Sequence, residues 1–408
     1  MPIAKKLCKV SRPDTVYAGS KSPSMKNKFF LIVTACAVFL TAQSPIQAAA
    51  PIPVVLITDL WHPHIDYDDH FDAATMYCLP GIDLKAVIID QTKGAAAGQG
   101  LPVKQLNALS GRSVPIVMGA LRRPMKSPSD TLDDDDCLDG VRFILKTLQD
   151  SSTPVVLVTV ASCRDLAAAF NRNPGLFREK AGKIYVFAGN GKEGEGEYNV
   201  GLDAVAYGTI MGSGLSIYWV PCYDGNPNNP NNPQGKHCSY WQSKVSDVLT
   251  NASEGLWKYF NYMWQRYDPA TKDPLLYLSL PIDPNDRNAA LSNNIRQLWC
   301  TAVFADITGR RFVYEKNKNK YFSIDSTAAI PGGCVVKPAY DWIDIDIEAS
   351  AGGGIQYRHS ASSTKVKQFN KTDMESYSKA MTEVTADLLK ASQSWPKPMP
   401  APPAGKHS

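Results

Sequence analysis

Residues 54–90 read VVLITDLWHPHIDYDDHFDAATMYCLPGIDLKAVIID. The stretch opens with an apolar run at 54–58, passes through an acidic segment into an amphipathic one at 69–79, and closes with a second apolar run at 84–90. Continuous apolar runs rich in valine and isoleucine are typical of strands that are buried on both faces. We therefore expect a strand, a helix and a second strand parallel to the first.

The same alternation continues along the chain. Further strands are expected at 114–119, 155–160, 183–189 and 215–221, and helices at 101–110, 138–149, 163–171 and 201–212. Two more amphipathic segments, 243–266 and 373–393, are expected to be helices. Repeated strand–helix–strand units predict an α/β fold, a Rossmann-like open and mostly parallel sheet with helices on both faces. Ligands of such folds bind at the carboxyl ends of the strands.

Composition and charge exclude several classes of protein. The 408 residues are 44% hydrophobic and 20% charged, which is too apolar for a disordered or fibrous chain. The formal charge of +4 belongs to the N-terminus, because residues 1–50 alone carry a net +6 and the remainder sums to −2. The residues after position 50 therefore lack the net positive charge that is typical of proteins that bind nucleic acid or anionic lipid.

The N-terminus has the pattern of an export signal. Met25 is followed by Lys26 and Lys28, by the apolar run FFLIVTACAVFLTA (29–42) and by the small residues of IQAAA (46–50). The run is shorter than the roughly 20 residues that a spanning helix needs. We expect residues 1–48 to be a signal peptide with an upstream extension and the protein to be secreted or periplasmic, with no membrane association beyond export. A lipid-attachment role for Cys36 is the rival interpretation.

The remaining chain is expected to hold one catalytic domain, 51–393, and a disordered tail, 394–408, whose proline content is typical of such segments. Seven cysteines follow residue 50 without the spacing of a zinc site. Cys222 and Cys238 bracket a polar loop and could pair in an oxidising compartment.

An acidic segment follows the first strand directly. Five carboxylates and three histidines lie between Asp59 and Asp72. Such crowded like charges repel one another unless a proton or a cation neutralises them, and oxygen-rich clusters suit a hard divalent ion such as Ca²⁺. A helix cap in a solvated loop is the alternative, although a cap needs one aspartate rather than five. His62 and His64 are further candidates for metal binding or acid catalysis.

Several segments, in their order along the chain, resemble one family. They are the acidic loop after the first strand, GRSVPIVMGALRRPM (111–125), TPVVLVTVASCRDLAAAFNRNPGLF (153–177), KIYVFAGN (183–190) and GEYNVGLDAVAYGTIMGSGLSIYWVP (196–221). Over about 55–221 the sequence is similar to the nucleoside hydrolases that prefer inosine and uridine. The resemblance implies hydrolysis of the N-ribosyl bond of a nucleoside or related riboside, by a water that Ca²⁺ or another divalent cation binds and an aspartate deprotonates. The resemblance is also compatible with assembly of this chain into a homo-oligomer.

The resemblance also implies roles for particular residues. Asp59 would be both a metal ligand and the catalytic base, and Asp69 a second ligand, with Asp66 or Asp72 as alternates. The Arg164 carbonyl would complete the metal site. The sugar hydroxyls would be bound by Glu197 and Asn199, although an ordinary turn before a helix is the simpler interpretation of these two residues.

One part of the family pattern is missing. The family supplies a His–Asp pair from a late helix, whereas the corresponding segment here, 296–311, offers Trp299 and Cys300, with Asp306 about two turns further on. Trp299 could stack on a nucleobase or belong to the core. This departure keeps two alternatives open: a secreted nucleoside- or sugar-binding protein without turnover, and a hydrolase of another glycosidic bond.

Overall fold

The computed structural model describes residues 50–60, 68–90, 100–120, 123–135, 137–192, 196–225, 234–264, 273–279, 289–350, 352 and 354–396. The predicted signal peptide, Asp66, His62, His64 and the tail from residue 397 lie outside the described residues. Of the predicted tail, Ser394 to Pro396 are described, and Trp395 packs against the hydrophobic core. The described chain thus extends past residue 393, and its last described residues include one that contributes to the core.

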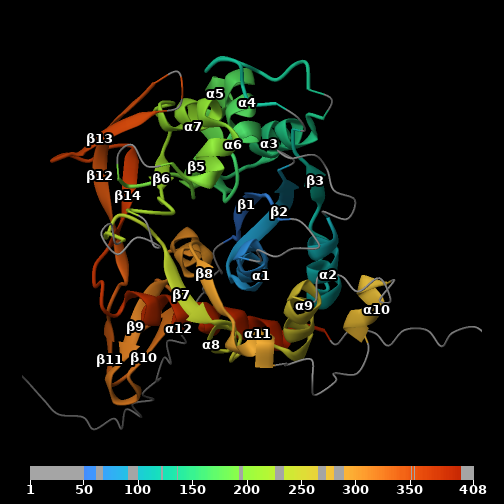
Figure 1. Cartoon of the computed structure of the whole chain (residues 1–408), viewed down its shortest axis with the longest axis vertical. Coiled ribbons are helices and arrows are strands. Elements are labelled where there is room, and N and C mark those ends of the chain that lie inside the picture. Colours follow the sequence, from blue (N-terminus) through green and yellow to red (C-terminus); the bar gives the residue numbers. More distant parts are fainter. Residues whose placement is uncertain are drawn as a thin grey trace, which may run out of the picture. The chain divides into compact units, whose positions relative to one another are not determined.

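A nine-stranded sheet forms the centre of the fold, in the order β13-β12-β14-β6-β5-β4-β1-β2-β3 (Figure 1). Its first six strands in sequence are all parallel to their neighbours. They are β1 (Ile52–Thr58), β2 (Ile82–Ile89), β3 (Ile116–Met118), β4 (Val155–Thr159), β5 (Ala181–Val186) and β6 (Ile217–Trp219). The predicted α/β fold class, with its mostly parallel sheet, is confirmed.

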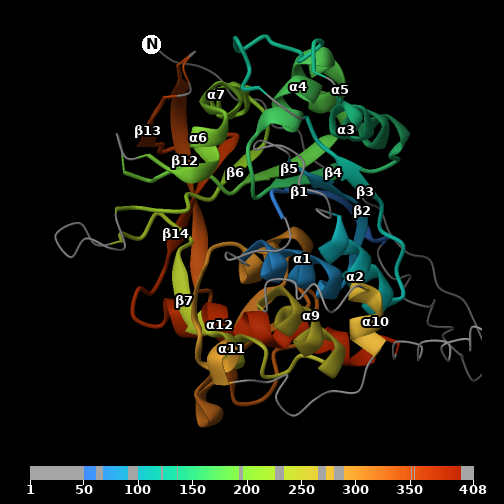
Figure 2. The ribbon, with the colours of Figure 1, turned by 45° about the vertical axis from the view of Figure 1, so that its right-hand side comes forward.

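Helices cover both faces of this sheet (Figure 2). One face carries α1 (Asp68–Cys78), α2 (Leu101–Ser110), α9 (Glu254–Trp264) and α12 (Tyr377–Leu389). The other carries α3 (Asp139–Asp150), α4 (Arg164–Arg172), α5 (Pro174–Lys180) and α7 (Ala204–Met211). Along β1, Val54 and Leu56 belong to the first core, and Val55 and Ile57 to the second. This alternation explains why the strand is apolar throughout.

The C-terminal half departs from the prediction. The segment expected as one helix, 243–266, divides into β7 (Trp241–Lys244), α8 (Val245–Val248) and α9, because the Ser253 hydroxyl accepts a hydrogen bond from the Leu256 N–H and starts a new helix. The segment 296–311 is not one helix either. It contains most of β8 (Ile295–Leu298), which pairs with β7, followed by the 3₁₀ helix η2 (Thr301–Thr308).

Six strands after residue 310 were not predicted. β9 (Arg311–Glu315), β10 (Lys320–Ile324) and β11 (Cys334–Val336) form a small antiparallel sheet. β14 (Val366–Lys371) extends the main sheet parallel to β6, and β12 (Tyr340–Ala349) and β13 (Ile355–His359) add an antiparallel edge.

The shorter helices complete the described chain. They are α6 (Tyr198–Leu202), α10 (Pro274–Ser279), α11 (Ala289–Asn293), η3 (Lys316–Lys318) and η4 (Lys390–Ser394). Within the described ranges, no helix combines the length and the apolar character that crossing a membrane requires.

Candidate functional site

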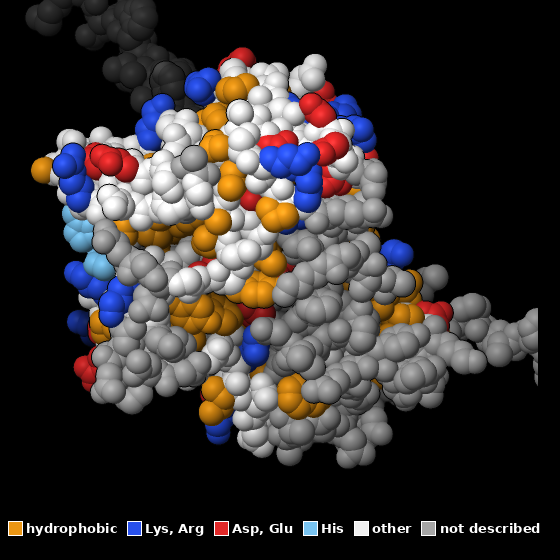
Figure 3. Space-filling model, turned by 45° about the horizontal axis from the view of Figure 1, so that its top comes forward, with side chains coloured by type: hydrophobic (Ala, Val, Ile, Leu, Met, Phe, Trp, Pro, Cys, Tyr) orange, Lys and Arg blue, Asp and Glu red, His pale blue; other side chains and the backbone are white. Residues whose placement is uncertain are grey.

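A cavity of about 400 Å³ opens at the carboxyl ends of the parallel strands. Asp59 follows β1, Val160 follows β4, Phe187 follows β5 and Cys222 comes shortly after β6, and all four line the cavity. The strand order reverses direction between β1 and β4, with β2 and β3 on one side and β5 and β6 on the other. Ligands of open α/β sheets bind at such a switch point. On the face drawn in Figure 3, hydrophobic side chains border a recess with acidic side chains visible between them.

Four aspartates form one wall of this cavity: Asp59, Asp68, Asp69 and Asp72. The last three come from the first two turns of α1, where carboxylates are favoured by the helix dipole. The Thr58 hydroxyl donates to the Asp69 Oδ2 over 3.1 Å, and Arg296 pairs with Asp68 over 3.3 Å. The predicted convergence of Asp59, Asp69 and Asp72 is therefore present, and Asp68 joins it.

Burial and mutual repulsion hold protons on this acidic wall. Burial is the largest cause that raises the pKa of Asp68 to about 8, with the charges of Asp72 and Asp59 adding to it. Burial raises the pKa of Asp69 as well, and a hydrogen bond with Asp59 contributes. Two carboxyl groups can share a hydrogen bond only when one of them carries a proton. Beyond the ion pair with Arg296, the wall therefore requires a proton or a further cation to compensate its charge.

Asp72 reaches the segment that carries Trp299 and Cys300. Its Oδ1 accepts a hydrogen bond from the Thr301 N–H over 3.0 Å, and its side chain also bonds to the Cys300 thiol. Burial raises the pKa of Asp72 to about 7, although both of these bonds lower it. Only 3% of Asp72 is exposed, so a carboxylate from α1 occupies the space in front of Cys300 and Thr301.

Glu197 and Asn199 line the opposite part of the cavity and are also bound to the fold. The Glu197 carboxylate caps α6 by accepting from the N–H groups of Asn199 and Val200, and it accepts a third bond from Gly189 N–H. The Asn199 amide nitrogen donates to the carbonyls of Val160 and Phe187, over 3.2 Å each. Glu197 is therefore the N-cap of an ordinary turn before a helix. The Asn199 Oδ1, in contrast, accepts no hydrogen bond from the described residues.

An aromatic cluster forms a third wall. Trp299 and Tyr223 both line the cavity, with ring centroids 5.8 Å apart at a steep angle. Tyr240 packs behind them, 5.9 Å from Trp299 and 6.1 Å from Tyr223. Trp299 is half-buried, so it belongs both to the cavity and to the core. Flat rings of this kind suit a planar heterocycle.

The donor set suits a hard divalent cation in its chemistry, since carboxylate oxygens are the preferred ligands of Ca²⁺ and Mg²⁺. The uncompensated negative charge of the acidic wall also favours a bound cation. Within the part of the chain that the structure describes, however, no three His, Cys, Asp or Glu side chains are grouped so as to hold a metal ion.

Two residues that the sequence connected with the site lie elsewhere. Arg164 is fully buried and does not line the cavity; its guanidinium pairs with Asp203 over 3.2 Å and donates to the Leu202 carbonyl. Asp306 is held by Lys183 at 2.8 Å and by the Trp342 indole at 3.2 Å, also away from the cavity.

Sequence reasoning missed several lining residues, of which Asp68 is the most consequential. Its position beside Asp69 at the start of a helix was the available signal. The other missed residues are Val160, Phe187, Tyr198, Cys222 and Tyr223, whereas Cys300 had been named only as a departure from the family pattern. Val160 and Phe187 lie within the last three residues of predicted strands and could have been found from their position near the strand ends, whereas Tyr223 carries no local signal.

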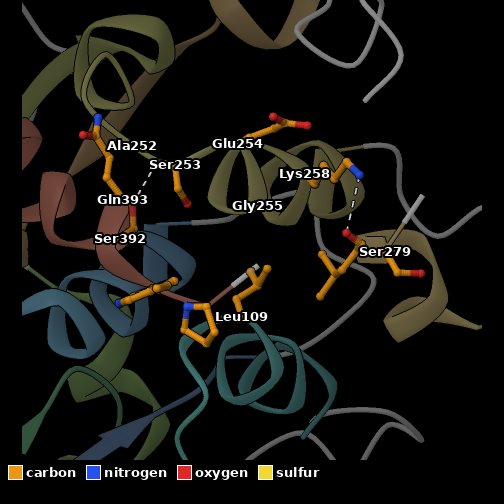
Figure 4. A pocket seen from close by; sticks show the side chains of 12 residues that line it. Leu109, Ala252, Ser253, Glu254, Gly255, Lys258, Ser279, Ser392 and Gln393 are labelled. Atoms are coloured by element: carbon orange, nitrogen blue, oxygen red, sulfur yellow. Dashed lines mark hydrogen bonds between the residues drawn. The ribbon is translucent and has the colours of Figure 1, made fainter. Parts of the chain in front are cut away.

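A second cavity, of about 530 Å³, lies between α9, α10 and the end of η4 (Figure 4). Lys258 extends along it and donates to the Leu278 carbonyl, and the Ser253 N–H donates to the Ser392 hydroxyl. Among its described lining residues, Glu254 is the one carboxylate. It lies away from the strand ends and lacks a set of converging titratable groups, so the cavity beside β1 is the better candidate.

No protein-family model matches the sequence, and no curated protein sequence matches it. Solved structures do match in fold. The inosine–uridine preferring nucleoside hydrolase from Bacillus anthracis matches with a TM-score of 0.44 and 10% identity, over 83% of this chain and 99% of that one. The purine-preferring ribonucleoside hydrolase from Gardnerella vaginalis matches with a TM-score of 0.48 and 12% identity, over 83% and 99%. A plant nucleoside hydrolase matches with a TM-score of 0.45 and 16% identity, over 85% and 100%. These proteins are nucleoside hydrolases, the family that the sequence resembles, and at such identities the likeness concerns the fold.

Proposed function

We propose that this chain is an exported hydrolase that splits the N-glycosidic bond of a nucleoside or a related riboside. One observation carries the proposal: a single cavity at the strand ends combines an acidic wall, an amide that can bind a sugar hydroxyl, and an aromatic wall. These three surfaces correspond to the three parts of the reaction, which are water activation, sugar binding and departure of the base.

The acidic wall would activate the water. Asp59 is the proposed general base, and a carboxylate hydrogen-bonded to the attacking water can take its proton as the water adds to the anomeric carbon. The negative charge of the wall would also favour the positive charge that develops on the sugar in an oxocarbenium-like transition state. A bound divalent cation would lower the pKa of the water, and Asp59, Asp68, Asp69 and Asp72 are the residues that would hold it.

The other two walls would place the riboside. The Asn199 Oδ1 would accept a hydrogen bond from a sugar hydroxyl, because the amide nitrogen is fixed by the carbonyls of Val160 and Phe187. Trp299 and Tyr223 would stack on the base. Burial raises the pKa of Tyr223, so its hydroxyl keeps its proton and can donate to the departing base.

The first experiment measures ribose release from a panel of nucleosides with Ca²⁺ and with a chelator. We expect chelator-sensitive release, and we expect Asp59→Asn to reduce it at least a hundredfold, the order of magnitude of general-base catalysis. Asp150→Asn is the matched control, because Asp150 is an exposed helix residue that forms an ion pair with Lys146 on the same helix. Equal turnover in the two variants would show that Asp59 is not the base.

A binding protein without turnover is the second candidate. Two observations favour it: the Glu197 carboxylate is occupied by three backbone N–H groups, and the described cavity residues include no histidine. Ribosides that raise the melting temperature of the protein, without any release of ribose, would establish this candidate instead.

A further inference from the structure

The two chain segments on either side of the polar loop carry Cys222 and Cys238, both of them buried free thiols in the structure. The Ser239 N–H donates to the Pro221 carbonyl over 2.9 Å, and closer to the loop the Gly235 N–H donates to the Asp224 carbonyl over 2.6 Å. These two bonds show that the segments run antiparallel, with a change of register by one residue between the two bonds. When residue 221 lies opposite residue 239, residue 222 lies opposite residue 238.

The hydrogen bonds also define the kind of pair that the cysteines form. The Pro221 carbonyl points toward Ser239, whereas the Cys222 N–H points to the other side and donates to the Gly189 carbonyl over 2.9 Å. Cys222, which follows Pro221, and Cys238, which precedes Ser239, therefore lie beside each other across this hydrogen bond. Neighbouring chain segments of this kind bring Cα atoms into the range of about 4.4–6.8 Å that disulfides need, and the two thiols are near enough for their charges to interact.

We propose that Cys222 and Cys238 form a disulfide bond under oxidising conditions. The bond would join the two segments that carry Tyr223 and Tyr240, the tyrosines that pack against Trp299 in the cavity. It would thereby fix the aromatic wall at both of its ends.

One neighbour of Cys238 favours the reaction against the effect of burial, which raises the pKa of this thiol. The Lys371 ammonium donates to the Cys238 sulfur over 3.4 Å, and a positive charge at this distance favours the thiolate that attacks a disulfide. With oxidised glutathione as the oxidant, one cysteine thiolate attacks a glutathione sulfur and releases one glutathione thiolate. The second cysteine thiolate then attacks the protein sulfur of the mixed disulfide. The protein loses two electrons and two protons, and two molecules of reduced glutathione form.

Trypsin provides a direct test on the whole chain, because cleavage after Lys192, Lys236 and Lys244 separates the two cysteines. Peptide 193–236 contains only Cys222, and peptide 237–244 contains only Cys238. After refolding with oxidised and reduced glutathione, we expect the two peptides to be joined in a non-reducing digest. The intact mass should fall by about 2 Da as the bond forms, and the melting temperature should exceed that of the reduced protein by about 5 °C.

Cys222→Ser should abolish the joined peptide, whereas Cys334→Ser, the matched control in β11, should leave it unchanged. Unlinked peptides from the oxidised wild type would overturn the proposal. A link between peptide 193–236 and peptide 297–310, which contains Cys300, would also overturn it. None of these measurements requires catalytic activity, so the disulfide is tested independently of the proposed function.

Discussion

At the scale of single residues, the cavity uses side chains that also maintain the fold. Asn199 joins the segments after β4 and β5 by donating to Val160 and Phe187, and it also lines the cavity. Glu197 caps α6 beside it. A substitution at such a position has two separable effects, one on stability and one on ligand binding.

Asn199→Ala should show both effects. Loss of two hydrogen bonds to buried carbonyls should lower the free energy of unfolding by about 1–3 kcal/mol, and loss of the sugar contact should raise the KM for ribosides roughly tenfold. Asn171→Ala is the matched control, because the Asn171 amide also donates to two carbonyls, those of Pro128 and Asp130, and Asn171 does not line the cavity. Chemical denaturation and steady-state kinetics of both variants check this. An unchanged KM in Asn199→Ala would remove Asn199 from the sugar site.

At the scale of elements, the contact between α3 and α4 depends on a buried carboxylate. Asp165, at the start of α4, accepts the Ala120 N–H after β3, over 3.1 Å to each carboxylate oxygen. Gly140, in the first turn of α3, lies so close that a Cβ atom there would overlap the Asp165 carboxylate and approach Ile88 to 2.9 Å. The helix can pack at this distance only because residue 140 has no side chain.

Gly140→Ala should therefore destabilise the protein, although alanine is the better helix former. Overlap with a buried and hydrogen-bonded carboxylate should lower the free energy of unfolding by about 1–3 kcal/mol. Gly201→Ala, in α6, meets no atom within 4 Å and should be neutral or slightly stabilising. Melting temperatures of the two variants test the difference, and equal values would contradict this account of the α3–α4 contact.

The start of α12 should make stability depend on pH. Hydrogen bonds from the Ser376 hydroxyl and N–H, together with Lys337 at 3.1 Å, lower the pKa of Asp373 to about 2. A lowered folded-state pKa contributes stability above the unfolded value of 3.8, and this contribution is lost as the pH falls toward 2. We expect Asp373→Asn to lower the melting temperature at pH 6 and the gap to wild type to shrink between pH 4 and pH 2. A gap that stays constant over this range would contradict the assignment.

At the scale of the whole molecule, two distant parts of the chain meet at the acidic wall. Asp72, in α1, accepts a hydrogen bond from Thr301, more than two hundred residues later. The first strand–helix unit and the start of η2 are thus held together beside the buried carboxylates. A cation bound there would stabilise the native state as a whole, because the unfolded chain does not bring these groups together.

Calcium should therefore raise the melting temperature, and a chelator should reverse the rise. At a concentration one hundred times the dissociation constant, the stabilisation should be about 2.7 kcal/mol. Asp72→Asn should reduce the shift, whereas Asp134→Asn should not, because Asp134 is an exposed carboxylate paired with Arg123 and Lys126 on a distant surface loop. Thermal melts with and without calcium check this. Equal shifts in both variants would place the calcium somewhere other than the acidic wall.

Strands β1 to β6 of the main sheet could be predicted from the sequence. The remaining strands, β12 to β14, could have been predicted in part. β12 reads YDWIDIDIEA, and its alternation of polar and apolar residues was an available signal for a half-exposed strand. The 296–311 segment could not be assigned in this way. Its apolar residues suit a helix, but pairing of β8 with β7 decides its conformation, and that pairing involves residues some fifty positions apart.

By itself, the sequence determined the parallel strands, the helices between them and the position of the acidic segment after β1. These features follow from local hydrophobic periodicity and from the order of elements, which a single chain displays directly. Only the tertiary structure decided that Asp68 joins the acidic wall, that Asp72 faces Thr301 and that Tyr223 and Trp299 share a wall. Arg164 pairs with Asp203 in the interior for the same reason. Such contacts depend on how separate elements pack, and local sequence does not specify that packing.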